Sequence, residues 1–517
     1  MHSALTPTAD AMPRMRAAPP VRGILAATAL FVFAVPFTAY ARLILVHFYL
    51  RGSFLLDSGL LAALIWHSDD RLSLPASLGG ESFFAIHIAP VLVALGWLSR
   101  ALPLTMPQFF ATFIGTCHGL LALAVFWLLV EGYAMRRGAA LAVAALAALG
   151  FSFGGLAVAI ALYPHFETLE AASLLLFLVA LVLHRFRVAA AWFVLALATR
   201  EDAGLHAALL LTVVLAANAI RGVAWPARRA AIGFAAAGLA HGLAALALQH
   251  VCFPGHSSFV RVYLGTPPFA HLDAMLLAMR TAFIVRYRAY IALPAFGALI
   301  WAARARSPYP LLGFAACLPW TALHLLAASP FAGLLAGYYG FPFLLALAWP
   351  LLGALVERGG ALRPQDRRAA VAGFGAILVL GAIPLGGAYN PGRLAVPAAF
   401  LVAPSRARQV ATDAAVAAVI AARPQLGRLV VDNSVAALRP TDFARGEVAS
   451  WAGAAAPDTV VMFAAGYDAA RLRALSARAG LTEAYRVPGT QIVVQSRLDL
   501  QRVPAFGPLL RRVPGVP

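Results

Sequence analysis

Lysine is missing from this chain of 517 residues, so all 40 of its basic residues are arginines. Charged residues of any kind are scarce, at 12% of the chain, whereas 62% of the residues are hydrophobic and the mean hydropathy is +0.81. Soluble domains carry about twice that share of charge. The composition therefore excludes a soluble globular protein and predicts many membrane spans.

The formal net charge of +19 would suit a nucleic-acid-binding protein, but the distribution of the arginines argues against that class. They lie mostly in short loops between apolar stretches, which is typical of a protein that its basic loops orient in a bilayer. Anionic lipid headgroups supply the complementary charge. We therefore expect the membrane lipid bilayer as a partner and no nucleic acid.

Cysteine is almost absent as well. Cys117, Cys252 and Cys317 lie within or beside apolar stretches and show no paired spacing. This excludes a disulfide framework and a CxxC metal site, so we interpret all three as packing residues. The chain also has no P-loop and no Rossmann glycine motif.

A long apolar run at Gly23–Val46 follows several arginines, which predicts a first membrane span with a cytoplasmic N-terminal tail at residues 1–21. Ala39-Tyr40-Ala41 resembles a signal-peptidase site, so cleavage is an alternative, although the run is longer than a usual signal core. A long outer loop at 47–106 follows, and it includes an amphipathic or re-entrant stretch at Phe83–Leu98.

Later apolar stretches predict a membrane domain at residues 22–388 with about eleven spans in all, counted at the length that crosses the hydrocarbon core. The spans after the first are expected near 107–134, 139–162, 168–184, 188–199, 203–219, 230–251, 287–303, 308–327, 337–356 and 369–388. The inner loops of this arrangement hold thirteen arginines, whereas the short outer loops hold only Arg200. This bias supports the alternation and predicts a multi-pass protein of the cell inner (cytoplasmic) membrane.

The tail, residues 389–517, has a different character. It begins with the turn Asn390-Pro391-Gly392 and then shows the patterns of a small α/β domain. We expect helices at 406–422 and 468–479, and strands at 429–432, 459–463 and 491–495. An odd number of spans makes this domain extracytoplasmic, and its arginines do not oppose that placement because large translocated domains are exempt from the positive-inside rule. The predicted fold class is thus a mainly α, polytopic membrane protein with a small C-terminal α/β domain.

Most polar residues of the hydrophobic part are predicted at one level, the outer membrane surface. They come from three separate outer loops, and in an apolar chain such a gathering marks a place of chemistry or binding. The members of this group are Asp57, His87, His165, Glu167, Arg200, Glu201 and Asp202. The remaining histidines, among them His118, His206, His241 and His324, are interpreted as structural.

Asp57 is the candidate catalytic residue, because an acid at the membrane surface can act as a general base toward a hydroxyl or can hold a divalent cation. Taken alone, Asp57 is explained more simply as the N-cap of a following helix. His165 and Glu167 could bind a metal ion with it or form an acid–base pair. Arg200 could hold a phosphate group while the two acids after it orient its side chain. The alternative is a solvated tight turn with an internal ion pair.

These elements resemble a family of uncharacterised multi-pass prokaryotic membrane proteins, domain of unknown function 2079 (DUF2079). The matching features are the acid-glycine element Asp57-Ser58-Gly59, the Phe-x-x-His-x-x-Pro string at Phe84–Pro90, the loop His165–Glu167, and the charged triplet that starts at Arg200. The family triplet usually begins with lysine. Arg200 keeps that charge in a different shape, which suits a phosphate role but not a lysine-specific one. The resemblance is clearest over the first half of the chain and weaker in the tail.

That family is in turn similar in layout to the GT-C membrane glycosyltransferases, which take sugars from polyprenyl-phosphate donors at the extracytoplasmic face. The resemblance implies sugar transfer from such a donor to an acceptor, with Asp57 as the general base or metal-orienting acid and Arg200 at the donor phosphate. His87, His165 and Glu167 would complete the polar pocket or ligate a divalent metal ion. Two alternatives stay open: a lipid-linked sugar carrier or flippase, for which charge near mid-depth is expected, and a non-catalytic envelope assembly protein.

Overall fold

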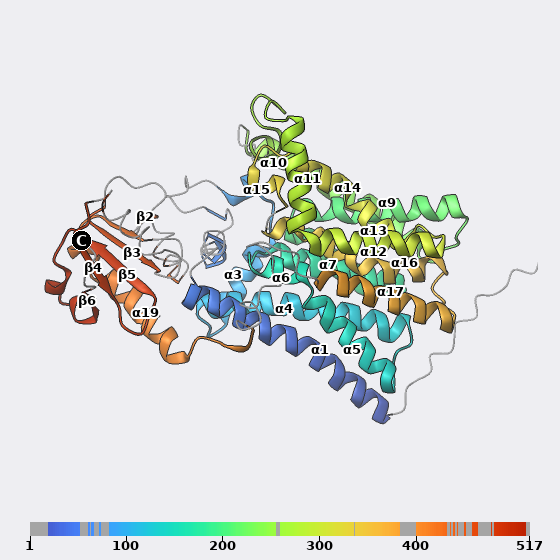
Figure 1. Cartoon of the computed structure of the whole chain (residues 1–517), viewed down its shortest axis with the longest axis horizontal. Coiled ribbons are helices and arrows are strands. Elements are labelled where there is room, and N and C mark those ends of the chain that lie inside the picture. Colours follow the sequence, from blue (N-terminus) through green and yellow to red (C-terminus); the bar gives the residue numbers. More distant parts are fainter. Residues whose placement is uncertain are drawn as a thin grey trace, which may run out of the picture.

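A bundle of helices makes up most of the protein, and a small sheet domain lies at one end of it in the computed structural model (Figure 1). The structure describes residues 19–51, 60–62, 64–66, 72–73, 82–254, 259–335, 337–382, 400–431, 435, 438–439, 442, 449–450, 457–463, 477 and 480–512. The predicted N-terminal tail and Asp57-Ser58-Gly59 lie outside these residues.

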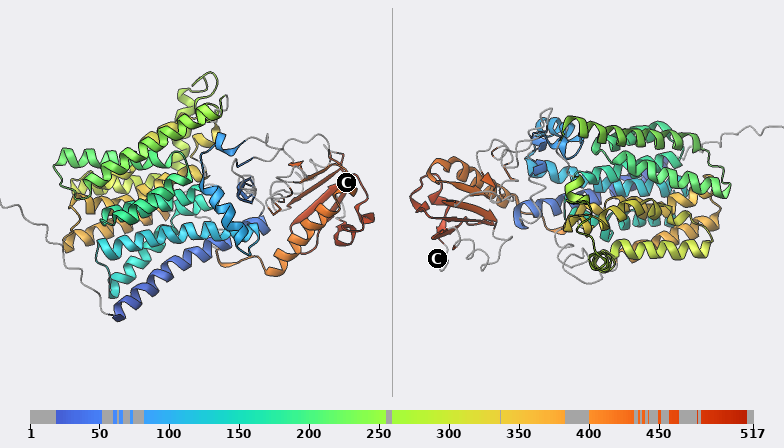
Figure 2. Two further views of the ribbon diagram at one scale, coloured as in Figure 1. Left: turned by 180° about the vertical axis from the view of Figure 1, so that it is seen from behind. Right: turned by 90° about the horizontal axis from the view of Figure 1, so that it is seen from above.

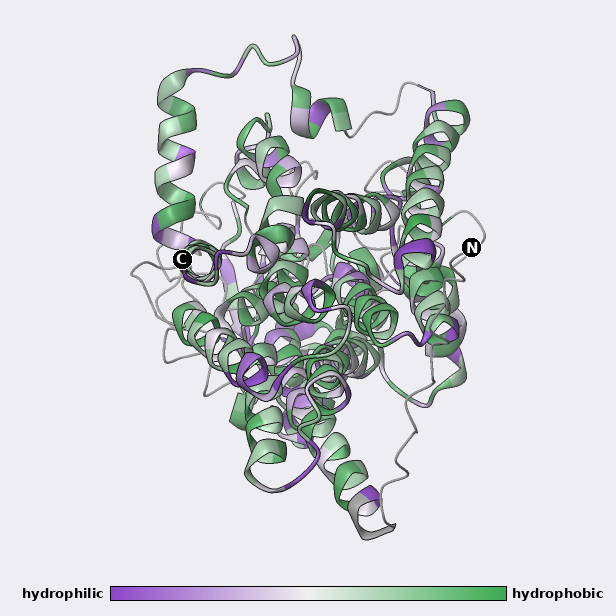
Figure 3. Cartoon of the chain, turned by 90° about the vertical axis from the view of Figure 1, so that its right-hand side faces the viewer, coloured by the Kyte–Doolittle hydropathy of each residue, from purple (hydrophilic) through white to green (hydrophobic). Residues whose placement is uncertain are grey.

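Most of the longer helices of the bundle coincide in order and position with predicted spans, whereas the span expected at 308–327 is divided into short helices at 312–316 and 318–325. The longer helices are α1 (Pro19–Val46), α4 (Met106–Trp127), α5 (Gly138–Ser152), α7 (Glu167–Val182), α8 (Phe186–Thr199), α9 (Ala203–Arg221), α10 (Arg228–Cys252), α11 (Ala274–Tyr287), α12 (Ala289–Ala305), α16 (Pro342–Glu357) and α17 (Pro364–Ala382). Shorter helices are α3 (Val91–Ala101), α6 (Gly155–Ala161), α13 (Leu312–Ala316), α14 (Leu318–Leu325) and α15 (Pro330–Gly333). Apolar residues dominate all round the bundle (Figure 3).

Four helical segments of the described chain are long and apolar enough to cross a membrane, and up to seven are when each bent pair of helices counts as one span. The prediction of one continuous span at 139–162 was wrong in detail, because α5 ends at Ser152 and α6 continues at an angle of 44°. The α11–α12 pair bends by 84°. Several apolar candidate spans are therefore present, and the total of about eleven stays a prediction.

Small residues lie where helices make close contacts, because a small side chain allows two helix backbones to approach each other. α1 lies along α4, and a Cβ atom placed on Gly115 of α4 would lie 2.5 Å from the Phe37 carbonyl oxygen of α1. α9 approaches α10 in the same way, since a Cβ on Gly238 would lie 2.5 Å from the Gly204 carbonyl oxygen. The α9–α10 hairpin matters for function because both helices line the site described below.

The connections between helices fall at two opposite ends of the bundle. Four connections that carry arginines, α4–α5, α7–α8, α9–α10 and α16–α17, lie at the end away from the sheet domain (Figure 2). The end of α1, the start of α4 and the α8–α9 corner lie at the end near the sheet domain. This arrangement agrees with the predicted alternation, and it places the loops predicted to be outer on the side of the C-terminal domain.

Helix α11 was missed from the sequence, which left residues 252–286 without a helix. It begins at Asp273, whose side-chain carboxylate accepts a hydrogen bond of 2.7 Å from the Leu276 backbone N–H. Such N-capping satisfies a backbone donor at the start of a helix. Met275 and Met279 are exposed on it, so its apolar face lies on the outside of the structure.

The C-terminal domain contains the helix expected at 406–422 and the three expected strands, together with three further strands that the sequence did not predict. Helix α19 (Arg406–Ala421) packs beside a sheet of order β2-β1-β3-β5-β4-β6. Its strands are β1 (Leu429–Val431), β2 (Ala449–Ser450), β3 (Thr459–Phe463), β4 (Glu483–Arg486), β5 (Ile492–Ser496) and β6 (Arg511–Arg512). β1 pairs with β2 and β3 in parallel, and β5 joins β3 to β4 in antiparallel register. Nearly all of the helix expected at 468–479 lies outside the described residues.

One hydrophobic cluster connects the C-terminal domain to the bundle. It includes Phe48, just after α1, Phe110 of α4, and Val416 and Val419 of α19. At its edge the Tyr49 hydroxyl lies 3.2 Å from both carboxylate oxygens of Asp413 in α19. The domain therefore rests on the end of the bundle through packed side chains.

Asp413 makes this contact sensitive to pH. Burial raises the pKa of its carboxyl above the usual range, and the hydrogen bond from Tyr49 offsets only part of that rise. The folded state then binds a proton more tightly than the unfolded state, so this contribution to stability is present below the unfolded pKa and is lost as pH rises through the folded pKa. The melting temperature of Asp413→Asn relative to wild type should therefore increase from pH 4 to pH 7. A difference that is constant or decreases over this range would contradict the assignment.

Candidate functional site

Arg200 lies at the corner between α8 and α9, where the backbone is extended and interrupts the helices. Its Nη1 donates to Oε1 of Glu167 at 2.8 Å, and its Nε lies 3.0 Å from Oδ1 of Asp202. Only 5% of Arg200 is exposed. The interpretation of the triplet as a solvated turn was therefore wrong, although the internal ion pair that it included is present. The acids orient Arg200, as the functional interpretation expected.

Glu201 connects this corner to the loop before α3. His87 Nδ1 lies 2.8 Å from Oε1 of Glu201, and the Ile88 backbone N–H donates to Oε2 at 2.9 Å. Together with Gln249 of α10, which donates to the Phe84 carbonyl oxygen, these bonds fix the segment that contains His87 against the bundle. Residues from the three described loops that were predicted to be outer thus meet at one place, as the sequence predicted.

His165 and Glu167 lie beside each other, with Nδ1 of His165 facing Oε2 of Glu167. Burial lowers the pKa of His165 well below its usual range, and the charges of His87 and Arg200 act in the same direction. Glu167 is fully buried, and its two oxygens face Arg200 and His165. Glu167 therefore serves as the counter-ion of Arg200, and this contact leaves it poorly arranged for the metal role that the sequence suggested.

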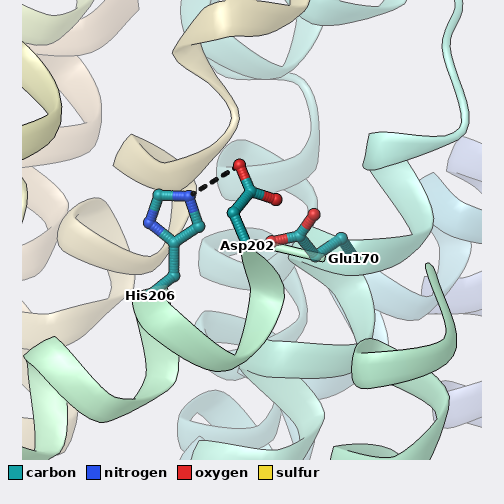
Figure 4. A group of neighbouring side chains, drawn as sticks. All are labelled: Glu170, Asp202 and His206. Carbon is teal, nitrogen blue, oxygen red and sulfur yellow. Dashed lines mark ion pairs between the residues drawn. The ribbon is translucent and has the colours of Figure 1, made fainter. Parts of the chain in front are cut away.

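Asp202 is held in the ionised state. Burial alone would raise its pKa, but the Arg200 guanidinium and His206 outweigh burial and hold the pKa well below the usual range. His206 lies one helical turn along α9, and its Nε2 is 3.7 Å from Oδ2 of Asp202 (Figure 4). The sequence had left His206 among the structural histidines. Its spacing of four residues from Asp202 is the one local signal that could have indicated it.

A cavity of about 430 Å³ opens beside this cluster. The polar part of its lining comes from the loop before α3, from the start of α9 and from Arg261. The apolar and aromatic part comes from α9, α10, α14 and the segments at 259–263 and 338–339. The lining residues that matter for the argument are His87, Arg200, Glu201, Asp202, His206, Leu246, Arg261, Tyr263, Trp320, Tyr338 and Tyr339. Charged groups and an apolar, aromatic surface thus line the same cavity, as is typical of ligand-binding sites.

Arg261 contributes the second cation of the cavity. It lies in the short π-helical segment η5 (Val260–Leu264) and is exposed. Among the described residues no carboxylate forms an ion pair with it, in contrast to Arg200. Sequence reasoning missed Arg261 because the stretch around it has no recognisable motif.

The described part of the chain thus defines a mainly helical protein with several apolar candidate spans, a small sheet domain at one end, and a cavity lined by both charged and apolar residues. No protein-family model matches the chain, and no curated protein matches it in sequence. The resemblance to DUF2079 and to the GT-C enzymes therefore stays a prediction.

Proposed function

We propose that this protein is a membrane glycosyltransferase of the GT-C type, which transfers a sugar from a polyprenyl-phosphate donor to an acceptor at the extracytoplasmic face. The observation that carries the proposal is the cavity that combines charged groups with an apolar and aromatic wall, at the end of the bundle next to the C-terminal domain. A polyprenyl-phosphate sugar has the same division into a charged, polar head and an apolar tail.

An apolar track on α10 supports this choice of substrate. Leu239, Leu243 and Leu246 are spaced by four and three residues, so they lie on one face of the helix. All three are exposed, and Leu246 also lines the cavity. A polyprenyl chain that follows this face would lie in the membrane while its phosphate reaches the cavity.

The cations of the cavity divide into two roles in this proposal. Arg200 is occupied by carboxylates, so its charge holds the acidic cluster together and is poorly placed to bind the donor phosphate directly. Arg261 is exposed and without an ion-pair partner among the described residues, so we assign the phosphate contact to it. This replaces the phosphate role that the sequence suggested for Arg200.

The sugar and the acceptor would meet where the polar and the aromatic parts of the lining come together. Tyr338, Tyr339 and Trp320 offer ring faces for the apolar side of a sugar and polar edges for its hydroxyl groups. Asp57, which lies outside the described residues, keeps its proposed role as the base that removes the proton of the acceptor hydroxyl.

Purified full-length protein, mixed with a radiolabelled polyprenyl-phosphate sugar and an envelope-derived acceptor fraction, tests the proposal. We expect label to leave the lipid and to appear in the acceptor fraction. A flippase would move the labelled lipid between the leaflets of a proteoliposome and leave the sugar bond intact. An assembly protein would do neither, and either of these results would overturn the enzyme assignment.

A further inference from the structure

Two acids of the site face each other without a described cation between them. Glu170, one turn into α7, points toward Asp202 at the start of α9, and His206 lies on the other side of Asp202 (Figure 4). One potential ligand atom from each of the three side chains lies within 4.8 Å of the other two. The three residues come from two helices that are packed together, so their spacing is fixed by the bundle.

Glu170 is fully buried, and neither of its carboxylate oxygens has a hydrogen-bond partner among the described residues. His206 Nε2 is also buried and makes no hydrogen bond there, and its nearest carboxylate oxygen, Oδ2 of Asp202, lies 3.7 Å away. A buried carboxylate without a donor is costly, because it has lost its hydration and gained nothing in return. This observation is independent of the clustering, and it indicates that something is bound between these side chains.

The charge balance indicates that the bound species is a cation. Glu167, Glu170, Glu201 and Asp202 surround Arg200, so four carboxyl groups share one guanidinium in this part of the described structure, an excess of acidic over basic groups. A divalent ion between Glu170 and Asp202 would remove most of that excess. It would also turn the repulsion between two neighbouring carboxylates into attraction of both toward the ion.

We propose that Glu170, Asp202 and His206 form a binding site for one divalent transition-metal ion, of the Mn²⁺ or Zn²⁺ class. Two carboxylates and one imidazole suit these ions better than Mg²⁺ or Ca²⁺, which prefer oxygen ligands alone. Bonds of about 2.1 Å to each ligand fit the observed spacing after small side-chain rotations. The site differs from the set Asp57, His165 and Glu167 that the sequence suggested.

The position of the ion follows from the lining of the cavity. Asp202 and His206 line it, whereas Glu170 lies behind them. A metal ion held by these three residues would keep its open coordination positions on the cavity side, as metal sites that bind a further ligand do. The metal proposal does not rest on sugar transfer, because it is tested by metal binding alone.

The test uses the detergent-purified full-length chain after removal of metals with EDTA. Titration with Mn²⁺, followed by electron paramagnetic resonance, should show one tightly bound ion per chain. Glu170→Gln should weaken its affinity by about 100-fold or more, since the loss of a direct ligand exceeds the effect of an outer partner. The matched control is Glu131→Gln, at the opposite end of the bundle beside Arg136 and Arg185, which should bind as wild type does.

A spectroscopic measurement keeps the proposal testable even when Glu170→Gln does not fold. Pulsed resonance of the wild-type Mn²⁺ complex should show coupling to an imidazole nitrogen, and His206→Gln should abolish that coupling. The proposal is overturned when wild type binds no stoichiometric ion, which would mean that Glu170 is neutralised by a proton instead. Wild-type affinity in Glu170→Gln, or an absence of nitrogen coupling, would overturn it as well.

Discussion

Arg200→Met should prevent this protein from folding stably. The substitution keeps the side chain long but removes the guanidinium that faces Glu167 and Asp202 inside the bundle. Removing one partner of a buried ion pair typically costs about 3–5 kcal/mol, because the other charge stays buried and unpaired. We expect a large drop in the melting temperature in detergent, or aggregated protein on size-exclusion chromatography.

Three further variants make the Arg200 experiment specific. Arg200→Lys retains the charge and should be far milder, although it loses the two-pronged geometry of the guanidinium. Arg261→Met removes an exposed cation of the same cavity and should leave the melting temperature almost unchanged. Adding Glu167→Gln to Arg200→Met should restore part of the lost stability, because it removes the unpaired charge. An Arg200→Met protein as stable as wild type would show that the acidic cluster is neutralised by other means.

Asp57→Asn should abolish sugar transfer while expression and membrane insertion stay normal. Asparagine has nearly the same shape as aspartate but cannot accept the proton of an attacking hydroxyl. A general base contributes about a hundredfold to ten-thousandfold to a rate, so the variant should retain a trace of activity at most. The measurement is transfer of the labelled sugar by equal amounts of purified wild type and variant.

Asp69→Asn is the matched control for this prediction, because Asp69 belongs to the same predicted outer loop in the sequence and has no assigned role. It should transfer sugar at close to the wild-type rate. Activity in Asp57→Asn equal to that of Asp69→Asn would exclude the base role and leave Asp57 with the simpler interpretation of a helix N-cap.

The helices of the bundle could be predicted because their signal is one of composition. An apolar stretch of sufficient length predicts a span wherever it occurs, and the arginines between the stretches fix their alternation. Composition does not reveal bends, however. α5 and α6 form one apolar stretch in the sequence, and the break after Ser152 depends on local backbone geometry and on the packing around it.

The errors in the rest of the fold have similar physical causes. α11 carries Arg280 and Arg286 and lies in a stretch of mixed polarity, so it gives no clear span signal. Strand β4 has four residues, of which only Ala484 and Tyr485 are buried, and such a short pattern cannot be distinguished from a loop. The longer β3 and β5 are buried throughout, and both were predicted.

The convergence of the site could be predicted in part. Polar residues that are predicted at one membrane surface share one thin layer, so they are expected to lie close together. His87, His165, Glu167 and the Arg200 triplet do meet. Their partners could not be foreseen from spacing. Glu167 forms an ion pair with Arg200, and Glu170 and His206 lie on either side of Asp202. These contacts depend on how α7 and α9 pack, which the spacing of residues does not reveal.

Photo-crosslinking tests the central claim, that the cavity binds a lipid-borne reactant, most directly. A polyprenyl phosphate with a diazirine near the phosphate would be bound to the purified protein, irradiated and mapped by mass spectrometry. We predict labelling in peptides that contain Arg261, Tyr263 and Trp320, and competition by unlabelled polyprenyl phosphate but not by a neutral polyprenol. Labelling spread over the lipid-facing helices, without these peptides and without competition, would contradict the claim.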